Sequence, residues 1–145
     1  MKFIYTLILF VSLLSTSAGQ NPGAAKTLVK SFNLLNNQIV ELQLDGDVTV
    51  QEWSNPTMRI QISVTLPDGS DAMLKSLVQA GRYNLKGATS TATYRVTAPN
   101  LQKEITIGGQ PLRERLAFLV YAPAEVMVKL ADSTTADVLN SAESF

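Results

Sequence analysis

The sequence predicts a mainly β fold: a single domain of alternating strands, arranged as a β-sandwich or a short β-solenoid-like stack, with one short amphipathic helix. Two observations carry this prediction. Apolar and polar residues alternate with a period of two along most of the chain after residue 20, and one stretch, 70–81, breaks the alternation with the spacing of a helix. Roughly 125 residues follow the first nineteen, which suits one domain with its own core.

The first nineteen residues have the composition of an export signal. Lys2 supplies a short basic start, residues 3–14 are almost uninterrupted apolar sequence, and residues 15–19 are small, as a signal peptidase requires. The apolar run is shorter than the about 20 residues that a membrane span needs. We therefore expect a signal peptide at 1–19, no membrane span after its removal, and a bacterial protein that is periplasmic or secreted.

Strands are expected wherever alternate side chains are apolar, because such a pattern buries one face of a sheet. The expected strands are 40–44, 48–50, 58–66, 92–98, 105–107, 116–121 and 126–130. Asp45-Gly46 lies between two alternating runs and predicts a hairpin or tight turn. The segment 116–121 is apolar on both faces, which predicts a central strand covered on two sides and ended or bent by Pro123.

Helical spacing appears only between residues 70 and 81, where the apolar positions are Met73, Leu74, Leu77 and Val78. Ser70 can cap the helix start and Asp71 suits the positive end of its dipole. Gly81 can adopt the left-handed conformation that closes a helix. The β domain is expected to cover 20–131, followed by a small, polar and poorly ordered tail at 132–145.

Charge and composition exclude several classes of function. The chain has twelve basic and twelve acidic residues, no cysteine and no histidine. A neutral chain lacks the basic stripe that nucleic-acid binding requires and the polybasic cluster that holds a protein on anionic lipid. Without histidine, Ser-His-Asp and Cys-His catalysis and histidine-ligated metal sites are excluded. Without cysteine, the fold relies on packing rather than disulfides, and there is no lipid-attachment cysteine.

Carboxylate chemistry remains formally open through Asp45, Asp47 and Glu52, because glycoside hydrolysis needs only two acids at a set separation. A turn explains Asp45 and Asp47 better than a calcium site or catalysis. Gly108-Gly109 and residues 67–69 also predict turns, since neither matches a phosphate loop. We therefore expect no catalytic, cofactor-binding or metal residues: the protein is not an enzyme and uses no cofactor.

Three aromatic residues are possible ligand contacts: Trp53, Tyr83 and Tyr94. Together they could form a platform on which a sugar stacks. Single aromatic residues on strands more often fill cores and strand ends, and this is the interpretation we favour. The charged run 113–115 is expected to be a solvated turn before the strand at 116–121 rather than a binding patch.

Several segments resemble one family of bacterial exported proteins. They are 30–34, the run 40–50 with Trp53 after it, 80–85, and the late strand 118–128 around Pro123. Over about residues 30–130 the chain resembles adhesin-like proteins of the β-solenoid type, described as auto-transporter adhesins with a head domain. The resemblance implies an adhesive role and a chain that corresponds to the leading section of such a domain.

Two kinds of function fit these observations. The first is an exported, non-catalytic, adhesin-like envelope module that binds an envelope protein or a glycan through a sheet face, a loop cluster or an exposed strand edge. The second is a structural or assembly component of the cell envelope with no small-molecule ligand. A glycan platform predicts exposed, clustered aromatic rings, whereas a structural component predicts buried rings and an unpaired apolar edge.

Overall fold

The computed structural model describes residues 23–131, so the expected signal peptide at 1–19 and the tail at 132–145 lie outside the described residues. One helix, α1 (Asp71–Gln79), lies between the fourth and fifth strands. The strands are β1 (Ala24–Phe32), β2 (Ile39–Gln43), β3 (Asp47–Trp53), β4 (Met58–Leu66), β5 (Lys86–Ser90), β6 (Thr93–Thr97), β7 (Thr106–Ile107), β8 (Gln110–Pro111), β9 (Arg115–Pro123) and β10 (Met127–Leu130). The prediction of a mainly β domain with one short helix is confirmed.

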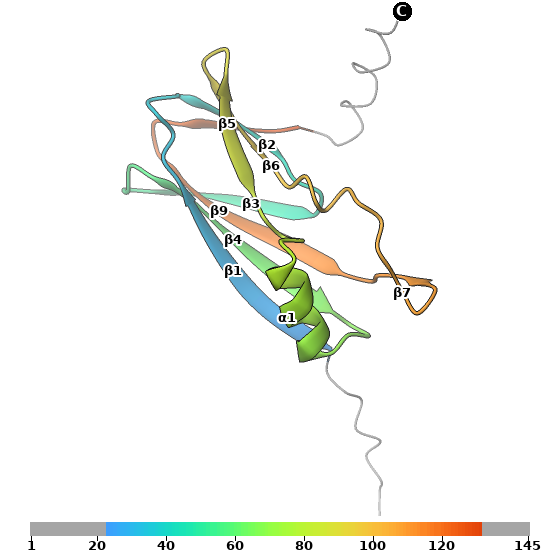
Figure 1. The fold of residues 1–145 in the computed structure, drawn as a ribbon. Coiled ribbons are helices and arrows are strands. Elements are labelled where there is room, and N and C mark those ends of the chain that lie inside the picture. The colour runs from blue at the N-terminus through green and yellow to red at the C-terminus, as the bar shows by residue number, and fades with distance from the viewer. Residues whose placement is uncertain (1–22, 132–145) are drawn as a thin grey trace, which may run out of the picture.

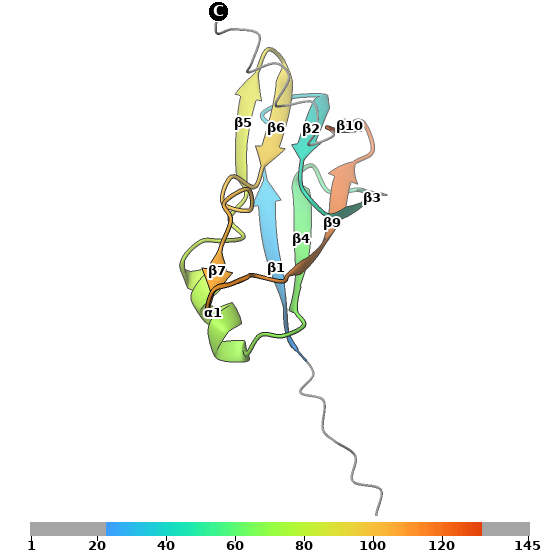
Figure 2. The same ribbon diagram turned by 90° about the vertical axis from the view of Figure 1, so that its right-hand side faces the viewer.

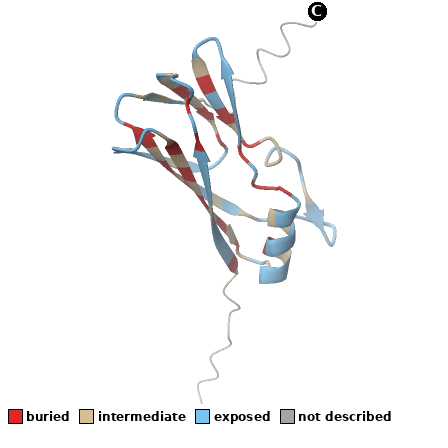
Figure 3. Ribbon diagram, turned by 60° about the vertical axis from the view of Figure 1, so that its left-hand side comes forward, coloured by how far each residue is buried: buried red, intermediate tan, exposed pale blue. Residues whose placement is uncertain are grey.

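Two four-stranded sheets face each other across one core (Figures 1 and 2). The first sheet has the order β1-β4-β9-β3 and the second the order β10-β2-β6-β5, while β7 and β8 form a small separate hairpin. Buried residues of both sheets, red on the ribbon in Figure 3, belong to one apolar cluster. This arrangement is a β-sandwich, and the described residues do not close into a solenoid or a barrel.

Strand β4 shows the predicted alternation most clearly. Its even-numbered residues, from Met58 to Leu66, are buried, while the residues between them are half-buried or exposed. Strand β9 pairs with β4 so that Phe118 lies opposite Ile62 and Val120 opposite Ile60. Leu119 points to the other face of β9 and is only half-buried. Strand β9 is therefore central in its sheet, but one face is covered rather than two.

Three pairs of strands run parallel: β2 with β6, β2 with β10, and β3 with β9. Strands β2 and β3 lie in different sheets, so Asp45-Gly46 forms a tight turn between the sheets and not a hairpin. Gly46 has a φ of +146°, and a Cβ there would lie 2.8 Å from the carbonyl oxygen of Leu116. Only glycine fits this turn, because a side chain would collide with the backbone of β9.

Besides the two-residue strand β8, two strands were not expected from the sequence, and both are edge strands of the sandwich. Strand β1 runs antiparallel beside β4, and of its nine residues only Ala24 and Phe32 are buried. Strand β5 runs antiparallel beside β6 and all five of its residues are exposed. An edge strand that buries few side chains carries no clear alternation, so its sequence has no period to detect.

Helix α1 has the predicted ends. The Ser70 hydroxyl accepts a hydrogen bond from the amide of Met73 at 3.2 Å, and Asp71 lies in the first turn. Gly81 follows the helix with a φ of +77°, the left-handed conformation expected of a closing glycine. Leu74 is buried, and the helix lies beside β1 at the lower end of the sandwich (Figure 1).

Replacing Ser70 with alanine is expected to lower the free energy of unfolding by about 1 kcal/mol, because loss of the hydroxyl leaves the Met73 amide without its acceptor. Ser76→Ala in the same helix is the matched control: its hydroxyl bonds back to the carbonyl of Ala72, and alanine is the better helix former. Urea unfolding of both variants measures the difference. Equal losses at the two positions would show that Ser70 does not cap the helix.

Candidate binding surface

Tyr83 and Tyr94, two of the three possible ligand contacts, lie in the core. They are 3% and 7% exposed. The Tyr94 ring meets the Phe32 ring edge-on across the sandwich, with 6.2 Å between the ring centroids, and it covers Gly87 of the neighbouring strand. A buried ring offers no face to a sugar, so neither tyrosine is available as a stacking surface in this fold.

Trp53, the third possible contact, ends strand β3 and is half-buried. Its ring centroid lies 5.3 Å from that of Tyr121, and the Arg59 guanidinium lies 5.0 Å from the indole ring. The indole nitrogen donates a hydrogen bond to the carbonyl oxygen of Thr57 at 2.9 Å. Trp53 thus packs against neighbouring strands at the end of its sheet. Trp53, Tyr83 and Tyr94 do not form a common platform.

Sequence reasoning missed a buried polar cluster centred on Arg82. Its guanidinium forms an ion pair with Glu114 at 2.6 Å, and the side chains are only 7% and 12% exposed. The same group donates hydrogen bonds to the carbonyl oxygens of Asn100 and Lys103. Arg82 therefore links the turn after α1 to two segments: the one between β6 and β7, which holds Asn100 and Lys103, and the one between β8 and β9, which holds Glu114.

Tyr83 completes this cluster by donating its hydroxyl to the second Glu114 oxygen at 3.0 Å. Burial raises the pKa of the Tyr83 phenol, and the negative charge of Glu114 raises this pKa further. The neutral phenol is thus favoured in the folded state, and its contribution to stability is lost as the pH rises above the ordinary tyrosine pKa of about 10. Glu114 is an internal anchor, which corrects the expectation that the whole 113–115 run is solvated.

The acids considered for catalysis are spread along β3 and the turn before it. Asp45, Asp47 and Glu52 are all exposed. Within residues 23–131, no group of three or more histidine, cysteine, aspartate or glutamate side chains is placed to hold a metal ion. Asp45 and Asp47 flank the turn at Gly46, which is the role expected for them.

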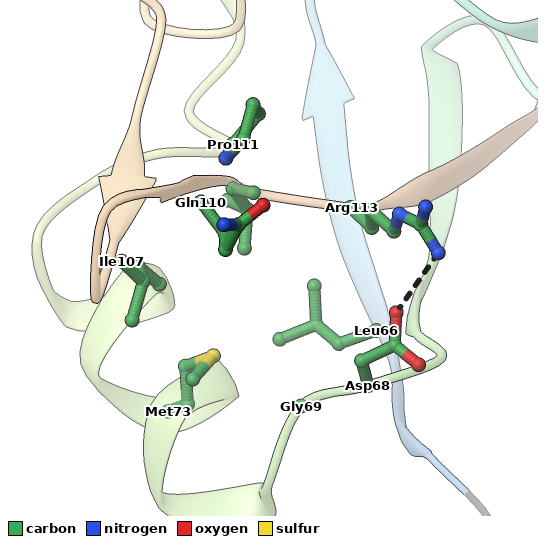
Figure 4. Close-up of a pocket in the computed structure, with 9 residues that line it drawn as sticks. Leu66, Asp68, Gly69, Met73, Ile107, Gln110, Pro111 and Arg113 are labelled. Atoms are coloured by element: carbon green, nitrogen blue, oxygen red, sulfur yellow. Dashed lines mark ion pairs between the residues drawn. The ribbon is translucent and has the colours of Figure 1, made fainter.

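A pocket of about 430 Å³ lies between α1, the turn after β4 and the β7–β8 hairpin (Figure 4). Its walls are mostly apolar, with contributions from Leu66, Met73 and Ile107. At the rim Arg113 and Asp68 form an ion pair at 3.6 Å, and both side chains are strongly exposed. None of the residues that line the pocket is a buried ionisable group, and its walls form a mainly apolar recess.

The most unusual surface lies at the end of the sandwich where β3 and β10 are the outermost strands (Figure 2). Val48 and Val50 lie beside the buried residues Phe118 and Val120 of β9, so they are on the inner face of the first sheet. Register with β2 likewise places Val128 and Leu130 on the inner face of the second sheet. Val50 and Leu130 are nevertheless 39% and 55% exposed.

No other part of residues 23–131 covers the interior of the sandwich at this end. We call it the open end and define it as strands β3 and β10 with Val48, Val50, Val128 and Leu130. Each strand has a hydrogen-bonded neighbour on one side only among residues 23–131. The open end combines backbone groups that can accept a further strand with apolar side chains that would become buried when one is added.

The opposite end of the sandwich is protected against such additions. In β1, Lys26 and Lys30 occupy inward positions opposite Val64 and Ile60, and helix α1 lies alongside. Inward-pointing charges, covering helices and very short strands are the usual protections of sheet edges. Strand β5 is short, and all of its residues are exposed. Within the described part of the chain, residues 23–131, only the open end presents an apolar interior.

No family model and no curated protein matches the chain. Similar solved structures include an adhesin candidate from Bacteroides fragilis, with 10% identity, a TM-score of 0.38, and coverage of 72% of this chain and 39% of that one. Another is a cell adhesion protein candidate from Clostridium sporogenes, with 10% identity, a TM-score of 0.40, and coverage of 74% and 46%. The chain thus spans less than half the length of either structure.

Among residues 23–131, no helix is both long and apolar enough to cross a bilayer.

Proposed function

We propose that this protein is an exported, non-catalytic contact module that binds a protein partner by strand addition at the open end. The observation that carries the proposal is the exposure of Val50 and Leu130, which point toward the core and yet remain 39% and 55% exposed. An adhesin-like role is the form of this function in which the partner belongs to another surface. Export rests on the signal peptide expected at 1–19.

The kind of partner follows from the chemistry of the open end. Unpaired amides and carbonyls along β3 and β10 form a ladder with an extended backbone, which a polypeptide supplies and a glycan does not. The two buried tyrosines remove most of the aromatic surface on which a sugar would stack. These observations favour a protein partner over a glycan.

A non-catalytic role is supported by the same description. The strongest buried ionic group, Arg82 with Glu114, has all of its contacts with the protein's own loops, and the exposed acids lie beside a turn. The structural alternative, a component of the cell envelope without a small ligand, would use the same open end. It differs in that the partner would be a permanent, stoichiometric neighbour rather than a reversible one.

The test compares quantitative capture of envelope proteins by the immobilised mature chain, by a Val50→Lys, Leu130→Lys variant, and by Val29→Lys. Val29 is a matched control because it is 58% exposed on the outer face of β1, away from the open end. We expect the open-end variant to lose at least about tenfold in affinity, since charges would have to be buried without a partner. Val29→Lys should bind as the parent protein does.

Full capture by the open-end variant would place the contact elsewhere and overturn the proposal. Loss of capture by Val29→Lys alone would assign it to the outer face of the first sheet. Melting curves of all three proteins ensure that folded molecules are compared. A reversible dissociation within minutes supports a contact module, whereas a complex that survives purification at fixed stoichiometry supports the structural alternative.

A further inference from the structure

The two strands of the open end run in opposite directions. Strands β2 and β3 are joined by a turn that reverses the chain between the sheets (Figure 1). Strand β10 is parallel to β2, so it runs opposite to β3. The open end thus presents two sheet edges of opposite direction, one from each sheet, on either side of an uncovered apolar interior.

We propose that a second copy of this chain closes the open end, with β3 of each copy pairing with β10 of the other about a twofold axis parallel to the strands. This inference rests on the proposed function and names the partner. Rotation about such an axis keeps strand directions and exchanges the positions of the two sheets. Each β3 therefore meets a β10 of opposite direction, which produces two antiparallel ladders.

The same rotation keeps the inner faces turned toward each other. Val48 and Val50 of one copy would continue the apolar row of Val128 and Leu130 of the second copy. The core of one sandwich would then run into the core of the other, and the side chains left exposed at the open end would be buried. Because the contact is isologous, every favourable pair occurs twice.

Charge complementarity favours this pairing over the alternatives. Strand β3 carries Asp47 and Glu52, whereas the one charged residue of β10 is Lys129. None of these three residues forms an ion pair with another residue within 23–131. Pairing β3 with a second β3 would place acids against acids, and like charges opposite each other destabilise strand pairs. Glu52 lies on the inner face of β3 with Val48 and Val50, because its partner Ala122 is buried, whereas Asp47 and Lys129 lie on the outer faces of their strands. Pairing β3 with β10 therefore brings Asp47 and Lys129, which carry opposite charges, to the same face of both ladders.

Charge reversal tests this arrangement with the mature chain in sedimentation velocity. The parent protein should show a monomer–dimer equilibrium that depends on concentration. Lys129→Glu makes the outer faces of both strands acidic, and Asp47→Lys makes both outer faces basic. Each variant alone should dimerise at least about tenfold more weakly, and an equimolar mixture should restore a heterodimer. Val29→Lys should dimerise as the parent does.

A parent protein that stays monomeric at millimolar concentration would overturn the proposal, as would a dimer unaffected by either charge variant. Slow exchange of the β3 amides with solvent in a monomer would also overturn it. Such protection would mean that residues 132–145 of the same chain occupy the open end. Capture of an envelope protein by such a monomer through Val50 and Leu130 would leave the proposed function standing. A parent protein that neither dimerises nor captures an envelope protein would overturn both proposals.

Discussion

Replacing Arg82 with alanine is expected to lower the free energy of unfolding by about 3–5 kcal/mol, because removal of one partner from a buried ion pair leaves the other charge without compensation. Glu114 would remain in a site where its side chain is only 12% exposed. The carbonyl oxygens of Asn100 and Lys103 would also lose their donor. Urea unfolding followed by tryptophan fluorescence measures the effect, since the chain has one tryptophan.

The exposed ion pair between Arg95 and Glu41 provides the matched control. Its side chains are 49% and 28% exposed, and the closest atoms are 3.1 Å apart. Arg95→Ala should cost no more than about 1 kcal/mol, as is usual for ion pairs in contact with water. A loss of similar size at the two arginines would mean that Arg82 is hydrated in solution and does not anchor the loops.

Replacing Phe118 with alanine is expected to cost about 3–5 kcal/mol, the usual range for removing a buried aromatic side chain from a core. Phe118 is 1% exposed and lies in the middle of β9, opposite Ile62 of β4 on one side and Val48 of β3 on the other. Alanine would leave a cavity bordered by both neighbouring strands, and the rigid sheet can collapse into it only in part.

Leu119→Ala is the control for this change, because the next residue of β9 points to the outer face and is half-buried. Its loss should be clearly smaller than that of Phe118→Ala in the same urea unfolding experiment. A larger loss of stability at Leu119 would mean that Leu119, and not Phe118, points into the core, since a shift of one residue exchanges the two sides of a strand.

The elements that could be predicted are those whose sequence pattern reflects burial. Strand β4 buries every second residue, so its alternation is nearly complete. Helix α1 carries both of its end signals, Ser70 and Gly81, within a few residues of its bounds. In both elements, local sequence and tertiary packing favour the same structure, which is the condition under which pattern reasoning succeeds.

The features that escaped prediction depend on neighbours distant in sequence. Strand β1 is defined by its pairing with β4, from Phe32 opposite Met58 to Ala24 opposite Leu66, and shows no alternation of its own. The burial of Glu114 depends on its ion pair with Arg82, and no pattern in the sequence between the two residues predicts this pair. Asp45-Gly46 predicts a turn correctly, but not that the turn leads into the other sheet.

The open end could be described only in general terms from the sequence, as an unpaired apolar edge. Val50 and Leu130 look like ordinary core residues in their alternating runs. Their exposure follows from the lateral order of the strands, since β3 and β10 are outermost in their sheets. Strand order is set by packing across the whole domain, so it cannot be derived from hydrophobic periodicity.

The unequal protection of the two ends of the sandwich limits how far association can proceed. A molecule with apolar edges at both ends could add copies indefinitely and grow into fibres. Here Lys26 and Lys30 would have to be stripped of water before a strand could be added beside β1, and helix α1 lies alongside. Among residues 23–131, the edges at β1 and β5 offer no comparable apolar interior once β3 and β10 are occupied, so the association that we propose would end at two copies, with the lysines of β1 acting against polymerisation.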